Sequence, residues 1–303
     1  MFLSAFTFAR NTDKLYYPIK ECISSVLPIA DEVIVALGEG DADDKTEEII
    51  RGIGDEKIKI YKRQWDLKLF ANSQIFAHET TFALNQCKGT WCIYLQADEV
   101  LHEDDLETIV GACKKYENDL SVDGMLFSYV HFWGDYEHLV ETHGLHRNEI
   151  RVVRNGIGAY SYKDALSFRK GSDEKLNVIK IPARIFHYGY MRPPELMSAK
   201  SKVHDALHSG NDLKMAEVER PGYDWGPLGG LKKFNGTHPK VMTDWIRKFN
   251  WATSLNFNKP GIYEQSPHRH LRPKYRFMTW LERNFNNNEE IFGFKNYRLI
   301  KRG

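Results

Sequence analysis

Residues 91–100 read Trp-Cys-Ile-Tyr-Leu-Gln-Ala-Asp-Glu-Val, an almost wholly apolar run that ends in an amide and two carboxylates. A short run without polar alternation is typical of a strand that is buried on both faces of a parallel sheet. Ligands of such sheets bind beyond the carboxyl ends of the strands. Asp98 and Glu99 are therefore placed where a hard divalent cation could bridge to a diphosphate, although an isolated Asp-Glu pair is more often a helix cap.

The preceding sequence repeats this layout of apolar strand, polar cluster and helix. Apolar runs predict strands at 2–8, 32–37 and 57–61, and helical spacing predicts helices over 13–26, 46–53 and 71–87. Polar clusters follow the three strands at residues 10–11, 39–44 and 64–66. The alternation predicts an α/β fold with a parallel-rich sheet flanked by helices, and with the polar clusters gathered at one edge.

The texture changes after Leu101. A helix is expected to begin at His102, and longer strands at 124–133, 149–153 and 176–187 are expected to make the sheet mixed. From Met191 onward Pro, Gly and His become common, and helical stretches at 195–208 and 239–256 are separated by loops. We place a boundary near residue 190, between a domain of residues 1–190 and a mostly helical and loop extension of residues 191–303.

Composition excludes several classes of protein. Of 303 residues, 42% are hydrophobic, 27% charged and 13% aromatic, and the net charge is +1, so we expect a folded globule that does not bind nucleic acid. The four cysteines form no Cys-x-x-Cys pair, which favours reduced thiols in the cytoplasm. The N-terminal apolar run stops at Arg10 and lacks a preceding basic residue, so we do not expect it to be a signal peptide. No run of 18 apolar residues is present, so we expect no membrane-spanning helix.

Several motifs together resemble the family-2 glycosyltransferases of GT-A fold. These are Arg10-Asn11, the acidic turn that ends in Asp44-Lys-Thr, and Leu95-Gln-Ala-Asp-Glu-Val. Residues 61–66 (Tyr-Lys-Arg-Gln-Trp-Asp) and 85–91 (Asn-Gln-Cys-Lys-Gly-Thr-Trp) are similar to the bacterial branch related to lipopolysaccharide-core β-1,4-glucosyltransferases. The resemblance covers residues 1 to about 190. It implies inverting transfer from a nucleotide-sugar, such as a UDP-hexose, to a glycan or lipid-linked acceptor of a bacterial surface polysaccharide or lipopolysaccharide.

Carried over position by position, the resemblance implies a nucleotide-binding set and a metal site. The nucleotide would contact Thr7, Ala9, Arg10, Asn11, Glu39, Asp66 and Gln96. Glu39 would accept a hydrogen bond from the base, and Asp98 would ligate Mn²⁺ or Mg²⁺. His187, at the end of an apolar run, is either a second metal ligand or an ordinary core histidine.

Two positions depart from the pattern of the branch. Gln96 replaces the first Asp of the usual Asp-Ala-Asp-Glu, which removes one charge from the metal motif. Thr81 stands on the long helix where the branch usually has Asn.

Asp164 is the candidate catalytic base. It follows an arginine-rich stretch at 147–154, and in the related branch a similar stretch precedes the acidic residue taken as the base. Inverting transfer needs one carboxylate to remove a proton from the acceptor hydroxyl. The rivals are Glu195 and the pair Asp173-Glu174, and Asp164 could also be an ordinary surface residue. The arginines of the stretch offer donors for phosphate, although strand alternation lets only one or two of them face a ligand.

Other readings stay open from the sequence alone. One is a non-catalytic relative that binds sugar-nucleotides or glycans, in which Gln96 marks a degraded metal site. A nucleotidyltransferase would share the sheet and the metal carboxylate, but its Gly-rich loop is missing after the first strand. The basic and aromatic run at 268–283 could lie on an anionic membrane, be a solvated face or form a contact in a homo-oligomer. We expect a cytoplasmic location, with peripheral contact at the inner face of the cell membrane as an open alternative.

Overall fold

The computed structural model describes residues 1–70, 74–209, 219, 221–259, 261, 268–286, 289–293 and 295–302. Half of its main sheet is parallel and has the order β4-β1-β2-β3. The four strands are β1 (Leu3–Ala9), β2 (Glu32–Gly38), β3 (Ile58–Arg63) and β4 (Trp91–Tyr94). They coincide closely with the predicted apolar runs, because apolar side chains on both faces can be buried only between two layers of helices. The predicted α/β class is confirmed.

The other half of the sheet is mixed, as the longer strands predict. Next to β4 lies the antiparallel β8 (Asn148–Arg154), followed by β6 (Gly124–Trp133), β7 (Asp135–Leu139) and the short β13 (Lys232–Lys233). The long β12 (Asn177–His187) runs parallel to β6 and to β14 (Arg298–Arg302), and antiparallel to β5 (Glu99–Leu101). The β12–β5 register sets His187 opposite Glu99, and so beside Asp98.

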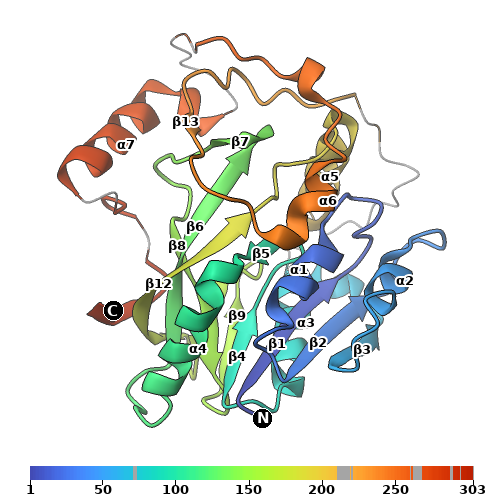
Figure 1. Cartoon of the computed structure of the whole chain (residues 1–303), viewed down its shortest axis with the longest axis vertical. Coiled ribbons are helices and arrows are strands. Elements are labelled where there is room, and N and C mark those ends of the chain that lie inside the picture. Colours follow the sequence, from blue (N-terminus) through green and yellow to red (C-terminus); the bar gives the residue numbers. More distant parts are fainter. Residues whose placement is uncertain are drawn as a thin grey trace.

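Helices cover both faces of the sheet (Figure 1). On one face α1 (Ile19–Val26), α2 (Thr46–Arg51) and α4 (Leu106–Lys115) bury a core against β1, β2 and β12. On the other face lie α3 (Gln74–Gln86) and a small sheet of β9 (Ala159–Tyr162), β10 (Ser167–Lys170) and β11 (Glu174–Lys175). The remaining helices are α5 (Pro194–His208), α6 (Thr243–Ile246) and α7 (Pro273–Phe285). Short 3₁₀ turns occur at Leu67–Leu69, Glu103–Asp105, Lys240–Met242, Ala252–Ser254 and Arg269–Leu271.

Two predicted helices differ from the structure. The helix expected from residue 13 begins only at Ile19, because Pro18 has no N–H and residues 13–16 form turns. The helix expected over 239–256 is wrong: α6 is a single turn between two 3₁₀ turns. Burial of Trp251 breaks the helical path, since its indole N–H donates to the carbonyl of Gly134 at 2.8 Å. Of the helix expected over 71–87, residues 71–73 lie outside the described residues.

The C-terminal third packs onto the ends of β6 and β12. A buried aromatic cluster joins Phe132 and Phe186, before residue 190, to Trp225, Met242 and Trp251, which follow it. The indole N–H of Trp133 donates to the carbonyl of Trp225 at 3.0 Å. Each of the four cysteines is buried without a disulfide. Among the described residues, every helix is too short or too polar to cross a membrane.

Candidate functional site

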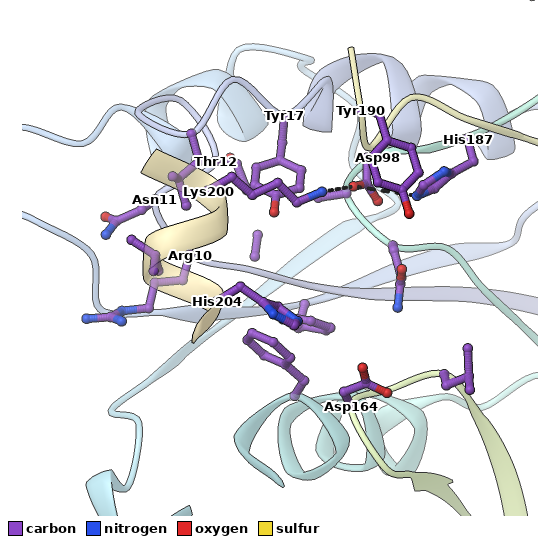
Figure 2. Close-up of a pocket in the computed structure, with 18 of the residues that line it drawn as sticks. Arg10, Asn11, Thr12, Tyr17, Asp98, Asp164, His187, Tyr190, Lys200 and His204 are labelled. Atoms are coloured by element: carbon purple, nitrogen blue, oxygen red, sulfur yellow. Dashed lines mark hydrogen bonds and ion pairs between the residues drawn. The ribbon is translucent and has the colours of Figure 1, made fainter. Parts of the chain in front are cut away.

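A pocket of about 260 Å³ opens at the carboxyl ends of β1 and β4 (Figure 2). Its walls come from the segments after these two strands, the β9–β10 turn, the end of β12 and one side of α5. Seven predicted site residues line it: Ala9, Arg10, Asn11, Gln96, Asp98, Asp164 and His187. The predicted polar edge of the parallel sheet is therefore a real concavity, and segments far apart in sequence complete it.

Asp98 is the centre of the charge arrangement in this pocket. Its Oδ2 lies 3.3 Å from Nζ of Lys200, 3.9 Å from Nε2 of His187 and 4.0 Å from a guanidinium nitrogen of Arg192. Burial by itself raises the pKa of Asp98, but the positive charge of neighbouring side chains, that of Lys200 above all, outweighs burial and lowers that pKa to about 2. One buried carboxylate thus faces two cations, so the wall carries a net positive charge that suits an anionic ligand.

Two consecutive hydrogen bonds, from His187 to His131 and from His131 to the carbonyl of His146, fix the tautomer and orientation of His187. The carbonyl of His146 can only accept, so the 2.8 Å contact requires a proton on Nε2 of His131. Burial lowers the pKa of His131 to about 4, so the ring is neutral at pH 7 and its Nδ1 accepts from Nδ1–H of His187 at 3.0 Å. Burial also lowers the pKa of His187 well below its usual value. Neutral His187 therefore keeps a lone pair on Nε2, the atom nearest Asp98.

A divalent cation here would have two protein ligands, Asp98 and His187, and would bind together with a diphosphate, because Lys200 and Arg192 outweigh the charge of Asp98. Gly189 leaves the necessary space, since a Cβ there would lie 2.5 Å from Nε2 of His187 and 2.8 Å from Oδ2 of Asp98. An oriented imidazole lone pair beside a carboxylate is a donor set that Mn²⁺ and Mg²⁺ accept. No cluster of three or more His, Cys, Asp or Glu suitable for a metal occurs within the described residues. The other positions would therefore have to come from diphosphate and water.

Asp164 lies across the pocket from Asp98, on the turn between β9 and β10 (Figure 2). Three hydrogen bonds hold this hairpin. The side-chain Nε2 of Gln96 donates to the carbonyl of Ala165 at 3.2 Å, and Nη1 of Arg151 donates to the carbonyl of Leu166 at 3.2 Å. The hydroxyl of Thr81 on α3 accepts from the N–H of Ser161 at 2.9 Å. The two positions that depart from the branch pattern, 81 and 96, thus both contact the hairpin that carries Asp164.

This contact gives Gln96 a role that aspartate could not perform, because a carboxylate cannot donate to the Ala165 carbonyl. We expect Gln96→Glu to lower kcat about tenfold or more by loosening the Asp164 turn. The affinity for nucleotide should change less than kcat, and steady-state kinetics with UDP calorimetry separates the two.

Thr81→Val is the matched control, because it loosens the same hairpin from outside the pocket. A fall in kcat in both variants identifies hairpin position as the cause. A loss of activity in Gln96→Glu that comes wholly from weaker UDP binding, with kcat unchanged, would contradict this role and assign Gln96 to the nucleotide.

The remaining predicted nucleotide residues lie outside this pocket. Thr7 is buried beneath α1, where it lines a small internal space with Cys22 and Ile23. Glu39 is exposed in an adjoining hollow of about 400 Å³, and Asp66 is exposed at the start of the turn after β3. Arg10 and Trp65 lie between the pocket and the hollow: the guanidinium stacks on the indole at 5.0 Å, and its Nε donates to the carbonyl of Glu39 at 2.7 Å.

The arginines predicted to bind phosphate have structural partners instead. Arg151 is fully buried and makes two 2.8 Å bonds to the Glu99 carboxylate. Arg154 donates to carbonyls at the end of α4, and Arg147 bonds Glu282 of α7 at 2.6 Å. The cations beside Asp98 are Arg192 and Lys200, which the sequence analysis missed. Only the packing of α5 distinguishes Lys200 from the other lysines.

Comparison with known proteins assigns the family. The sequence profile of Glycosyl transferase family 2 matches residues 9–176, more than half of the chain. The protein therefore belongs to this family. No curated protein sequence matches the chain significantly.

Solved structures with a similar fold include TarS from S. aureus and glucosyl-3-phosphoglycerate synthase from Mycobacterium tuberculosis. TarS 1–349 is 13% identical, with 72% of this chain and 68% of TarS 1–349 covered and a TM-score of 0.38. The UDP complex of TarS 1–349 is 16% identical, with 45% of this chain and 37% of that chain covered and a TM-score of 0.32. The chain thus spans little more than a third of that structure. The mycobacterial enzyme, in complex with Mn²⁺, UDP and phosphoglyceric acid, is 16% identical over 44% of each chain, with a TM-score of 0.30.

Proposed function

We propose that the protein is an inverting, metal-assisted glycosyltransferase that moves a hexose from a UDP-sugar to a glycan or lipid-linked acceptor. One observation carries the proposal: a single pocket has the carboxylate of Asp98, next to Lys200 and Arg192, on one wall and a second carboxylate, Asp164, on the opposite wall. Family membership supports sugar transfer. The bacterial surface polysaccharide or lipopolysaccharide pathway and the cytoplasmic location rest on the sequence resemblance.

The diphosphate of the donor would lie against the Asp98 wall. Lys200, which lines the pocket, donates to the carbonyl of Gly189 at 2.8 Å, and the fully buried Arg192 donates to the same carbonyl at 3.1 Å. Lys200 can bind phosphate oxygens there without moving far, and Arg192 adds positive charge within the wall. Asp98 and His187 would hold Mn²⁺ or Mg²⁺, which when bound supplies charge neutralisation for the leaving diphosphate.

The base of the donor would lie beside the Arg10–Trp65 pair. Among the described residues, Nε1 of Trp65 is buried without a hydrogen-bond partner, so a base carbonyl that displaced the indole slightly could satisfy it. Base–aromatic stacking on Trp65 would add affinity. Glu39, after β2, remains the proposed acceptor for a base N–H, and Asp66, beside Trp65, would lie on the same side as the base.

Asp164 would act on the acceptor. Its carboxylate takes the proton of the acceptor hydroxyl as that oxygen attacks the anomeric carbon, and the bond from the anomeric carbon to the diphosphate oxygen breaks with its electron pair going to UDP. Attack from the side opposite the leaving group inverts the anomeric centre. Residues 191–303 would form an extension that completes the acceptor side or an oligomer contact, since α5 already supplies one wall of the pocket.

A thermal-shift panel of UDP, GDP, CMP and dTDP, each with and without Mn²⁺, tests the proposal. A nucleotide present at 100 times its Kd should stabilise the folded protein by about 2.7 kcal/mol. We expect UDP with Mn²⁺ to give the largest shift, and hydrolysis of UDP-hexose to follow. Nucleotide binding without hydrolysis or transfer would favour the non-catalytic relative, whereas pyrophosphate release from a nucleoside triphosphate would favour a nucleotidyltransferase.

A further inference from the structure

The outer face of α7 presents an exposed aromatic patch. Phe277, Trp280 and Phe285 are 59%, 52% and 73% exposed. The rings lie together: Phe277 stacks on Trp280 at 6.2 Å, and Trp280 meets Phe285 edge-on at 5.6 Å. Contiguous exposed aromatic area of this kind marks an interaction surface rather than scattered surface apolar residues. Figure 1 shows α7 on the outside of the molecule, away from the parallel strands β1–β3.

The exposed charges on this helix are of one sign. Lys274, Arg276 and Arg283 are exposed beside the aromatic rings. Glu282, the one acid of α7, is fully buried and bonds His143 at 2.6 Å and Arg147 at 2.6 Å. The outer face of α7 therefore combines aromatic rings and cations with no exposed carboxylate of its own. We call Lys274, Arg276, Phe277, Trp280, Arg283 and Phe285 the α7 patch.

A hollow beside the α7 patch adds room for an anionic group. It has a volume of about 220 Å³ and is lined by Arg276, Trp280, Arg283 and Lys232, among others. Glu141 is in the same wall, where it pairs with Lys232 at 2.8 Å and with Arg283 at 3.3 Å. Three cations thus face one carboxylate, and this excess leaves charge for a phosphate group.

The inner face of α7 is fixed to the loop that reaches the catalytic pocket. The hydroxyl of Thr279 accepts from the N–H of His143 at 2.8 Å, and Glu282 bonds the side chains of His143 and Arg147. His146 lies between His143 and Arg147 in the sequence. It lines the pocket, and its carbonyl accepts from Nε2–H of His131. These hydrogen bonds connect α7 to the pocket, so a surface bound to α7 would be held at a fixed position relative to the pocket.

We propose that the α7 patch docks on the surface of an anionic lipid membrane, with Phe277, Trp280 and Phe285 in the headgroup region and the cations on lipid phosphates. Aromatic side chains combined with Lys and Arg are the composition that binds such interfaces. A second copy of the chain fits less well, because a two-fold contact through this face would bring the same cations of both copies together. Docking would bring the pocket close to a lipid-linked acceptor, a consequence that rests on the proposed function.

Flotation with lipid vesicles tests the proposal without any use of activity. The full-length protein is mixed with vesicles of neutral phosphatidylcholine, or of phosphatidylcholine with phosphatidylglycerol, at low and high salt. We expect binding to the anionic vesicles that high salt weakens. Phe277→Ala with Trp280→Ala should weaken it about tenfold or more, and Lys274→Gln with Arg276→Gln about 30-fold.

Leu120→Ala is the control, since Leu120 is 80% exposed in the loop between α4 and β6 and should not affect binding. All variants should retain wild-type UDP affinity, so failure of the donor site and failure of the α7 patch are distinguishable. Absence of binding to anionic vesicles, or binding unchanged in both double variants, overturns the proposal. So does a dimer, seen by analytical ultracentrifugation, that the aromatic double variant dissociates while no vesicle binding occurs.

Discussion

Asp98→Asn is expected to lower turnover roughly 10³-fold or more and to remove metal-dependent stabilisation by UDP. The substitution keeps the shape of the side chain but removes the negative charge that lies 3.3 Å from Nζ of Lys200 and 4.0 Å from a guanidinium nitrogen of Arg192. The wall would then keep two cations without the carboxylate that offsets one of them, and it would repel a divalent cation more strongly. Single-turnover kinetics and thermal shift with UDP, each with and without Mn²⁺, measure both effects.

Loss of a buried ion pair also lowers the free energy of unfolding, so a matched control is needed. Asp105 provides it, because this carboxylate is also buried and makes two 3.0 Å bonds to the guanidinium of Arg184. Asp105→Asn should destabilise the fold and leave metal dependence and turnover per folded molecule intact. Full activity of the wild type in a chelator would remove the metal from the mechanism and leave Lys200 and Arg192 as the diphosphate's cations.

Asp164→Asn is expected to lower kcat about 10²–10⁴-fold, the usual contribution of a general base. The amide keeps the size of the carboxylate and cannot accept the proton of the acceptor hydroxyl. Affinity for UDP should be unchanged, because Asp164 lies on the opposite wall from the Asp98 cluster (Figure 2). Calorimetry with UDP and initial rates at saturating donor separate the two effects.

The rival bases serve as controls. Asp173 is exposed, lies 3.5 Å from the hydroxyl of Tyr160, and does not line the pocket. Glu195 is exposed at the start of α5 and is likewise absent from the lining. Asp173→Asn and Glu195→Gln should therefore retain near-normal kcat. Normal kcat in Asp164→Asn together with a large loss in Glu195→Gln would transfer the role to Glu195.

Local pattern was enough for the parallel half of the fold. The run at 91–95 and its counterparts are apolar throughout, and such a segment has few stable places other than the centre of a covered sheet. The polar residues after these strands then had to share one edge. Arg10, Asn11, Gln96 and Asp98 were found in this way, and all four line the pocket.

Local pattern was not enough where burial of large side chains decided the backbone. Residues 239–256 have helical spacing, yet Trp251 is drawn into the aromatic cluster at the ends of β6 and β12, and the helix breaks. The arginine-rich strand gave a similar error. Its guanidinium groups pair with buried partners such as Glu99, which no spacing rule identifies.

The sequence by itself determined the α/β class, the edge at which the site lies and the carboxylate at its centre, because strand periodicity and the position of polar residues after strands are local properties. Only the tertiary structure decided which cations face Asp98, which nitrogen of His187 is free, and why Gln96 and Thr81 both serve the Asp164 hairpin. Those facts depend on contacts between segments as far apart as residues 98 and 200. Such contacts are set by the packing of α5, β12 and the hairpin against the sheet, and packing is a property of the whole chain.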